Sequence, residues 1–426
     1  MEPLNPNPPR EDDLPAGPAP QETPAPQETP APKNRRRVLA VVGELIKVIA
    51  LLLLGAAIAV LVVPPNWRLR ARTMSSTEKL DLLDQMVRDY YIDGDAVDRD
   101  AMQDDLAAAY IYGLGDPYSA YFSAEDYSAV LADNRGDMTG IGVSVTFDPA
   151  TTAIYVIRVY PSSPAEEAGL RPGDRVTAVA GETVTEDNYS ACVDNVRGAP
   201  GTSVALTVLR DGKTFEMSVI REDFVVTTVF ARRVGDVGVI EITGFNQPTA
   251  SQFRKAVEEL QGAGVKALIF DLRGNTGGLV DTTSEMLDLL LPEGELGYAV
   301  YNGGKRESMA TSDAAEVDLP MAVLVDRSTA SAAEYFTLAL RDYDKAVVVG
   351  ETTFGKGIMQ STMPLGDGSA VRLTVAKFYT KSGTEFHGVG ITPDVEAALP
   401  EGANRFLLSD EEDAVLQAAL NAIKKQ

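Results

Sequence analysis

Beyond Phe224 the chain alternates between short apolar runs and stretches with helical spacing, and this alternation limits the folds open to it more than any other feature. Three apolar runs, at residues 267–270, 321–325 and 346–349, have the length and composition of strands. The alternation predicts an α/β core over residues 223–400. In such a core, polar residues at the strand ends form the functional site.

The first of three loops after these strands reads DLRGNTGG. Its paired glycines, Gly277 and Gly278, can present backbone N–H groups to a developing oxyanion. Asp271 and Arg273 can pair and brace the turn. Alone this loop is a weak signal.

The second loop, DRSTASAAEYF, leads from a strand into a helix. Ser331 stands at this transition, where the N–H of Ala332 and the helix dipole can stabilise negative charge. Serines ahead of helices are usually N-caps, so on this loop alone a capping role for Ser328, Thr329 or Ser331 is the better explanation.

The third loop, GETTFGKGIMQ, places Lys356 between two glycines and Gln360 four residues later. A lysine acts as a general base only when burial lowers its pKa, and Phe354, Ile358 and Met359 offer an apolar setting. A solvent-facing lysine is the ordinary alternative.

Nucleotide binding and a histidine-based serine mechanism are two alternative functions for these loops. Residues 350–356 fit GxxxxGK of a nucleotide-binding loop, but Gly357 lacks the hydroxyl that magnesium needs, and the next residues alternate like a strand where a helix should begin. A histidine-based serine mechanism would have to use His387, the only histidine, which has no neighbouring motif.

Between these loops and the N-terminal part, short strands separated by Gly, Pro and Asp turns run from Gly140. Over residues 136–222 the sequence resembles a PDZ domain, with AEEAGLRPGDRV as its most recognisable stretch. The motif GIGV matches the loop that binds a peptide carboxylate through backbone N–H groups; it comprises Gly140, Ile141, Gly142 and Val143. A glycine turn that only serves packing is the alternative. Cys192 is interpreted as a small core residue.

The N-terminal part predicts a membrane anchor. Residues 1–37 form a proline-rich, repetitive tail that is expected to be disordered. Residues 38–63 are apolar apart from Glu44 and Lys47 and are long enough for a transmembrane helix; a cleaved signal peptide, with Ala57 and Ala59 near the cleavage site, is the competing interpretation. Basic residues before the span predict a single-pass plasma-membrane protein whose N-terminus is cytoplasmic and whose catalytic part is extracytoplasmic.

Helical regions are expected on both sides of the PDZ and peptidase parts. Residues 76–135 have helical spacing and include GDPYSAYF at 115–122, which is expected to pack against the larger domains. Residues 401–426 are expected to end in a helix. Either region could pair with a second chain, so a homo-oligomer is compatible with the sequence, although amphipathic helices usually pack on their own domain.

Composition excludes several partners. The net charge of −24 would repel nucleic acid. One cysteine and one histidine cannot form an intramolecular disulfide or an ordinary zinc site, and no carboxylate cluster is evident, so neither a metal nor another cofactor is expected.

Together the three loops resemble the C-terminal processing peptidases, also called tail-specific proteases. The likeness runs from about Ser76 onward, includes the inserted PDZ module and the late GVGITPD, and agrees in order and spacing. It implies a nucleophile, Ser331, a general base, Lys356, and a residue that orients the lysine, Gln360. The implied oxyanion hole consists of the N–H groups of Ala332 and of either Gly277 or Gly278.

Two residues depart from the family pattern: Thr276 replaces the usual proline and Ala333 a common serine. Neither position has an assigned chemical role. The resemblance implies an α/β multidomain serine endopeptidase that recognises protein substrates by their accessible C-terminal tails. A catalytically silent PDZ receptor in the membrane and an enzyme acting on non-protein esters or amides are the alternatives.

Overall fold

The computed structural model describes residues 43–44, 46–55 and 74–425. Residues 43–44 and 46–55 are helical, but much of the predicted span 38–63 and the whole predicted tail 1–37 lie outside the described residues. Within the described part, no helix combines the length and apolar character needed to cross a membrane. The membrane anchor therefore stays a prediction.

The described residues fall into two units, with the division after Ala96. The first unit contains helix α2 (Ser76–Tyr90) and a 3-10 turn (Gly94–Ala96). Ser75 caps α2, because its side chain accepts the N–H of Glu78 and the Glu78 carboxylate accepts the N–H of Ser75.

The second unit begins with helices α3 (Arg99–Tyr112) and α4 (Ala124–Arg135), as the helical spacing predicted. Between them lies a short strand, β1 (Ala120–Phe122). This strand pairs with β18 (Ala370–Thr380), far along the sequence. The segment 115–122 is therefore part of a sheet as well as a packing element.

The PDZ-like module is a six-stranded antiparallel sheet in which five strands follow the order β3-β4-β5-β7-β8 and β6 pairs with β5. Its strands are β3 (Val143–Asp148), β4 (Ala153–Val159), β5 (Arg175–Val179), β6 (Glu182–Thr183), β7 (Ser203–Arg210) and β8 (Lys213–Ile220), and its helices are α5 (Pro164–Glu167) and α6 (Tyr189–Val196). Cys192 is fully buried in the core of this module.

The two ends of the module lie side by side. Strand β2 (Asp137–Gly140) enters it and pairs with β9 (Glu222–Val225), which leaves it. The chain thus enters and leaves the PDZ-like module at one place, as expected of an inserted domain.

The predicted α/β core is built on a six-stranded sheet in the order β10-β11-β12-β15-β16-β19. All neighbouring pairs are parallel except β10 with β11. The strands are β10 (Val229–Val234), β11 (Val237–Ile242), β12 (Ala267–Asp271), β15 (Met321–Val325), β16 (Ala346–Gly350) and β19 (Val395–Glu396).

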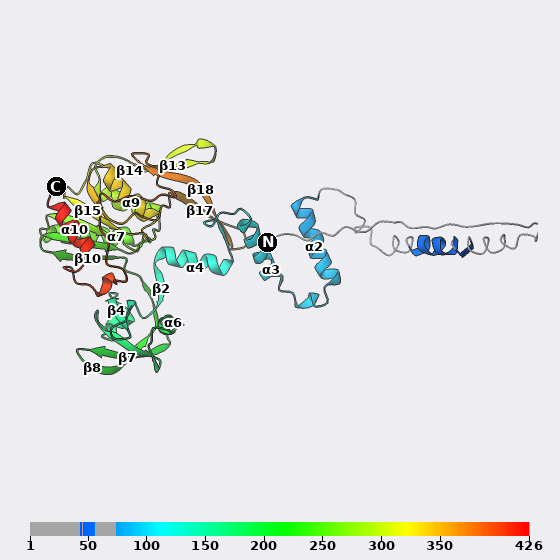
Figure 1. Ribbon diagram of the computed structural model, residues 1–426, viewed down its shortest axis with the longest axis horizontal. Helices are drawn as coiled ribbons and strands as arrows, with labels where there is room; N and C mark the ends of the chain where they lie inside the picture. The colour runs from blue at the N-terminus through cyan, green and yellow to red at the C-terminus, as the bar shows by residue number, and fades with distance from the viewer. Residues whose placement is uncertain (1–42, 45, 56–73, 426) are drawn as a thin grey trace, which may run out of the picture. The chain divides into compact units, whose positions relative to one another are not determined.

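Helices cover both faces of this sheet (Figure 1). Helices α7 (Thr249–Gly262), α8 (Val280–Leu290) and α9 (Ala332–Asp342) pack on the face that contains Leu268 and Phe270. Helix α10 (Ala414–Ile423) packs on the opposite face, against Ile269. Because both faces are covered, the central strands β12 and β15 are buried along their whole length and are apolar except for Asp271 at the end of β12.

A second, antiparallel sheet was not anticipated from the sequence. It contains β1, β18, β13 (Gly294–Tyr301) and β14 (Arg306–Ser312), and β17 (Ile358–Pro364) also pairs with β18. Because residues 358–364 form a strand, the helix that a nucleotide-binding loop requires after GxxxxGK is not formed.

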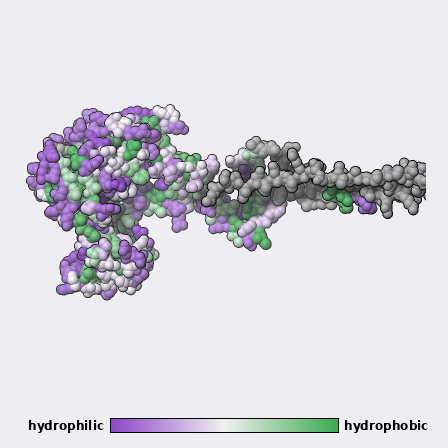
Figure 2. Space-filling view, viewed as in Figure 1, coloured by the Kyte–Doolittle hydropathy of each residue, from purple (hydrophilic) through white to green (hydrophobic). Residues whose placement is uncertain are grey.

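The visible surface of the second unit is mainly hydrophilic, with apolar residues in small scattered groups (Figure 2). This agrees with the strongly negative net charge.

Candidate active site

Three loops meet at the carboxyl ends of β12, β15 and β16, which are neighbouring parallel strands. The chain leaves these strands at Asp271, Val325 and Gly350. Hydrogen bonds connect the loops directly. The Thr329 hydroxyl donates to the Leu272 carbonyl at 2.9 Å.

Ser331 lies immediately before α9 in a strained conformation, with φ 58° and ψ −119°. Positive φ is uncommon for a residue with a side chain and costs about 1–3 kcal/mol, which the surrounding contacts must offset. The side chain is half-buried. A serine on a sharp strand-to-helix turn is typical of a nucleophile whose hydroxyl must face substrate.

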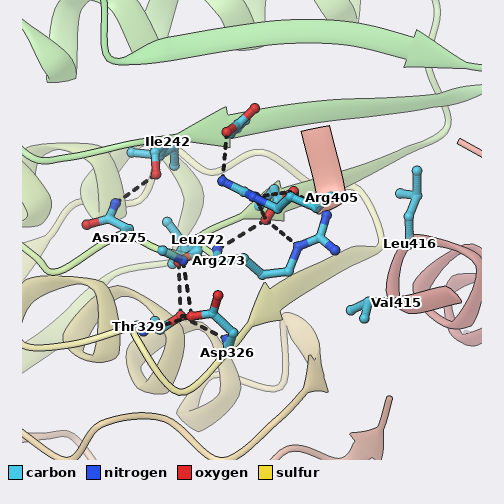
Figure 3. A network of polar contacts seen from close by, with 12 residues as sticks. Ile242, Leu272, Arg273, Asn275, Asp326, Thr329, Arg405, Val415 and Leu416 are labelled. Atoms are coloured by element: carbon cyan, nitrogen blue, oxygen red, sulfur yellow. Dashed lines mark hydrogen bonds and ion pairs between the residues drawn. The ribbon is translucent and has the colours of Figure 1, made fainter. Parts of the chain in front are cut away.

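The glycine loop is held against Ser331 by Asn275. The buried Asn275 amide donates to the Ile242 carbonyl and its Oδ1 accepts the N–H of Gly277, both at 2.8 Å. The Asn275 carbonyl accepts the N–H of Ala330 at 3.0 Å. Figure 3 shows Asn275 and its bond to Ile242.

Gly277 lies so close to Ser331 that only glycine fits. A Cβ there would lie 2.9 Å from the Ser331 Cβ and 3.0 Å from the Ala332 nitrogen. The N–H of Gly277 is occupied by Asn275. Within the described chain, the N–H groups of Gly278 and Ala332 donate to no protein group.

A buried charge network braces the glycine loop (Figure 3). Arg273 pairs with Asp271 at 2.6 Å, as the sequence suggested, and with Asp413 at 2.8 Å. Arg405 pairs with Asp271 at 3.2 Å and with Glu241 at 3.1 Å. Burial opposes the charge of Arg273, but the two carboxylates keep its pKa above the ordinary value. Burial likewise opposes the charge of Asp271, yet Arg273 holds its pKa below the usual range.

Glu334, which the sequence reasoning missed, joins the serine and lysine loops. It is fully buried in α9, and its Oε2 accepts the N–H of Ser331 at 2.9 Å and the N–H of Lys356 at 2.7 Å. Its Oε1 accepts the N–H of Gly355 at 2.7 Å and the hydroxyl of Thr353. The sequence feature that could have identified Glu334 is its position three residues after Ser331, a candidate N-cap, as in a capping box.

Lys356 is half-buried, and burial lowers its pKa. The positive charge of Arg372 lowers this pKa further, whereas Asp116 and Glu334 act in the opposite direction. Of the residues predicted to give the lysine an apolar setting, Ile358 is buried and Met359 is half-buried, but Phe354 is not. Phe354 is 55% exposed, and the Tyr118 ring instead lies 5.0 Å from the Lys356 Nζ.

The hydrogen bonds of the catalytic candidates run to other residues and not to one another. Gln360 donates to the Thr374 hydroxyl at 3.2 Å. Among the described residues, no hydrogen bond joins the Ser331 hydroxyl to Lys356, or Gln360 to Lys356. His387 lies beside Gly357, but its buried Nδ1 has no hydrogen-bond partner among the described residues.

The PDZ-like module contains a cavity of about 310 Å³. All four residues predicted to bind a peptide carboxylate line it: Gly140, Ile141, Gly142 and Val143. Apolar side chains, among them Val156, Leu170, Val193 and Phe224, line the rest. Gly142 has φ 77°, and a Cβ there would lie 2.2 Å from the Ser163 Cβ, so the loop requires glycine.

Over the described part of the chain, no three His, Cys, Asp or Glu side chains gather as a metal site requires.

Comparison with known proteins places this geometry in a family. Residues 236–397 match the model of peptidase family S41, and residues 155–210 match that of the PDZ domain. The chain is 33% identical over 332 residues to a CtpA-like serine protease of Staphylococcus saprophyticus, covering 76% of this chain and 67% of the relative. It is 36% identical over 323 residues to the carboxy-terminal processing protease CtpA of Bacillus subtilis, covering 75% and 68%.

Among solved structures, an S41 protease of Bacteroides fragilis shares the fold, with a TM-score of 0.56, 20% identity, and 75% of this chain and 90% of that chain covered. The similarity covers about two thirds of the length of each of these two relatives. The chain therefore belongs to the S41 family of serine peptidases, among the C-terminal processing proteases.

Proposed function

We propose that this peptidase cleaves protein substrates held by their C-terminal tails, with Ser331 as nucleophile and Lys356 as general base. The observation that carries the proposal is the buried Glu334 carboxylate, which accepts the backbone N–H groups of both residues. The two loops are thereby fixed to each other before substrate arrives, as preorganised catalysis requires.

In the proposed reaction the Ser331 oxygen attacks the scissile carbonyl while neutral Lys356 takes the hydroxyl proton. The tetrahedral intermediate collapses, and the leaving amine departs with a proton from the lysine. Water, deprotonated by the neutral lysine, then attacks the acyl carbonyl; the bond to the serine oxygen breaks, and that oxygen takes the proton back from the lysine. Gln360, which donates to the Thr374 hydroxyl, is assigned the role of orienting the lysine amine in this scheme.

The developing oxyanion is assigned to the N–H groups of Gly278 and Ala332. Gly277 is the weaker candidate, because its N–H already donates to Asn275. The N-terminus of α9 adds its partial positive charge at the same place.

Substrate docking is assigned to the PDZ-like cavity. Backbone N–H groups of the GIGV loop face a tail carboxylate, and the apolar lining accepts an apolar last side chain. A tail peptide with a free carboxylate should therefore bind, and the same peptide with an amidated terminus should bind at least about tenfold more weakly, measured by fluorescence anisotropy. Equal affinity for both peptides would contradict docking through the carboxylate.

The decisive experiment compares the parent with Ser331→Ala and Lys356→Ala on an unfolded protein that ends in an apolar tail. Cleavage by the parent alone, with tail binding kept in all three, supports the serine–lysine assignment. If all three bind the tail and none cleaves, the silent receptor is the better explanation. Cleavage by Lys356→Ala at the parental rate would show that another residue is the general base. His387→Ala would then test the only histidine for that role.

A further inference from the structure

The segment GDPYSAYF, residues 115–122, lies against the lysine although it precedes the PDZ-like module and falls outside the region that matches the peptidase family. Strand β1 at its end pairs with β18, with Ala120 opposite Arg372. The backbone N–H of Thr374 in β18 donates to the Ser119 hydroxyl at 3.1 Å. These contacts bring the Tyr118 ring to 5.0 Å from the Lys356 Nζ.

Asp116 fixes the conformation of this segment. Its Oδ1 accepts the N–H of Tyr118 at 3.0 Å, and its Oδ2 accepts the Ser119 hydroxyl at 2.6 Å. The Ser119 hydroxyl in turn accepts the backbone N–H of Thr374. The Thr374 hydroxyl accepts an N–H of the Gln360 side-chain amide. A continuous set of hydrogen bonds therefore runs from Asp116 to the amide expected to orient the lysine.

Three charged groups from separate elements act on the Lys356 amine. Arg372 comes from β18 and repels the ammonium, whereas Asp116, ahead of β1, and Glu334 in α9 favour it. The face of an aromatic ring also attracts a cation. Burial alone would raise the pKa of Asp116, but hydrogen bonds from Ser119 and Thr374 lead the effects that lower it. Asp116 is therefore ionised at neutral pH.

We propose that Tyr118 and Asp116 are positioning residues for the lysine: the Tyr118 ring holds the Lys356 ammonium, and Asp116 fixes that ring and ties it to Gln360 through Ser119 and Thr374. The inference rests on the proposed role of Lys356 as general base. It means that the catalytic site is completed by a segment outside the peptidase core.

The direction of the effect separates this role from simple packing. Removing the ring or the carboxylate charge takes away an interaction that favours the ammonium, so the pKa of Lys356 should fall. If the segment only excluded water, the same changes would admit solvent and the pKa would rise toward its ordinary value.

The test measures the amine itself. Full-length parent, Tyr118→Leu and Asp116→Asn proteins are labelled briefly with acetic anhydride across a pH series, and modification of Lys356 is followed by mass spectrometry. Only the neutral amine reacts, so the labelling midpoint reports the pKa. Both variants should lower the midpoint by about 0.5 to 1 pH unit.

Two further variants make the result specific. Tyr118→Phe keeps the ring and should restore the parental midpoint. Tyr112→Leu makes the same change as Tyr118→Leu at a tyrosine that is 86% exposed in α3, and should leave the midpoint unchanged. An unchanged or raised midpoint in Asp116→Asn and Tyr118→Leu would overturn the inference.

Because labelling needs no cleavage, the outcome is independent of whether Ser331 is the nucleophile. In Tyr118→Leu and Asp116→Asn, if they still cleave, the acid limb of kcat/KM should shift to lower pH together with the labelling midpoint. A shifted midpoint in a chain that cleaves nothing would support the contact with Lys356 while contradicting the proposed function.

Discussion

At the scale of single residues, Glu334 is the side chain on which the site most depends. It is a buried carboxylate that accepts hydrogen bonds from the backbones of Ser331, Gly355 and Lys356 and from the Thr353 hydroxyl. A buried charge is tolerated only when such donors surround it. Its removal leaves several donors unsatisfied at once.

We therefore expect Glu334→Gln to lower the free energy of unfolding by about 2–4 kcal/mol and to reduce kcat/KM by at least about a hundredfold. The amide presents an N–H₂ group where the carboxylate accepts. Urea unfolding and a peptidase assay measure the two effects. The control is Glu351→Gln, whose partner Arg327 is 85% exposed, and it should change stability by less than about 0.5 kcal/mol. Equal effects in both variants would contradict a special role for Glu334.

The second prediction concerns the positive charge of Arg372 in β18. Its charge lowers the pKa of Lys356, so Arg372→Gln should raise that pKa and move the acid limb of kcat/KM to higher pH, by roughly 0.5 to 1 unit. Activity at a fixed pH below the midpoint falls by about 3- to 10-fold, because less lysine is neutral. The pH profile of kcat/KM measures the shift. Arg372→Lys keeps the charge and should stay near the parent, and a shift of the same size there would rule out the electrostatic explanation.

At the scale of elements, the glycine loop is shaped by contact with the neighbouring loop. Gly277 and Gly274 both have positive φ, 105° and 76°. A Cβ at Gly277 would meet Ser331, whereas the nearest atom to a Cβ at Gly274 is the end of the flexible Arg405 side chain, at 3.9 Å.

Gly277→Ala should therefore abolish cleavage, because the added methyl group displaces the nucleophile. Gly274→Ala carries similar backbone strain, about 1–2 kcal/mol, without that contact, and should keep most of its activity. Titration with a serine-reactive fluorophosphonate, scored for labelling of Ser331, reads the effect directly. Comparable loss of labelling in both variants would assign the effect to strain and not to contact with Ser331.

At the scale of the whole molecule, the PDZ-like module and the peptidase core share charged contacts. Arg158 in β4 pairs with Glu241 in β11, and its guanidinium lies 4.2 Å from the centre of the Phe230 ring. Glu241 also pairs with Arg405, which reaches Asp271 at the start of the glycine loop. The PDZ-like module thus contacts the same network that braces the proposed oxyanion loop.

The topology of the whole chain supplies the last prediction. If residues 38–63 anchor the protein with the N-terminus in the cytoplasm, protease added outside intact bacterial protoplasts should digest a tag placed after Gln426 and spare one placed before Met1. The full-length chain should stay with the membrane fraction. Release of a shortened chain lacking the N-terminal tag would favour a cleaved signal peptide.

The sequence alone determined the strands that lead into the candidate site and the identity of the three loops. Apolar runs of strand length fix where β12, β15 and β16 form, because such residues are buried on both sides of a parallel sheet. The polar residues after them identify the candidate nucleophile and base, and the GIGV motif identifies the proposed carboxylate loop. These features are local, so they can be recognised in a single sequence.

Only the tertiary structure decided what surrounds the lysine. Tyr118 and Asp116 are distant from Lys356 in sequence and reach it because β1 pairs with β18. The second sheet escaped prediction because strand pairing depends on partners that no local pattern specifies. From the local sequence Glu334 is recognisable only as part of a helix cap. Its hydrogen bonds to the lysine loop form because β15 and β16 pair in parallel, which brings the loops after these two strands together. Local periodicity determines elements, whereas burial, charge and pKa depend on neighbours that folding supplies.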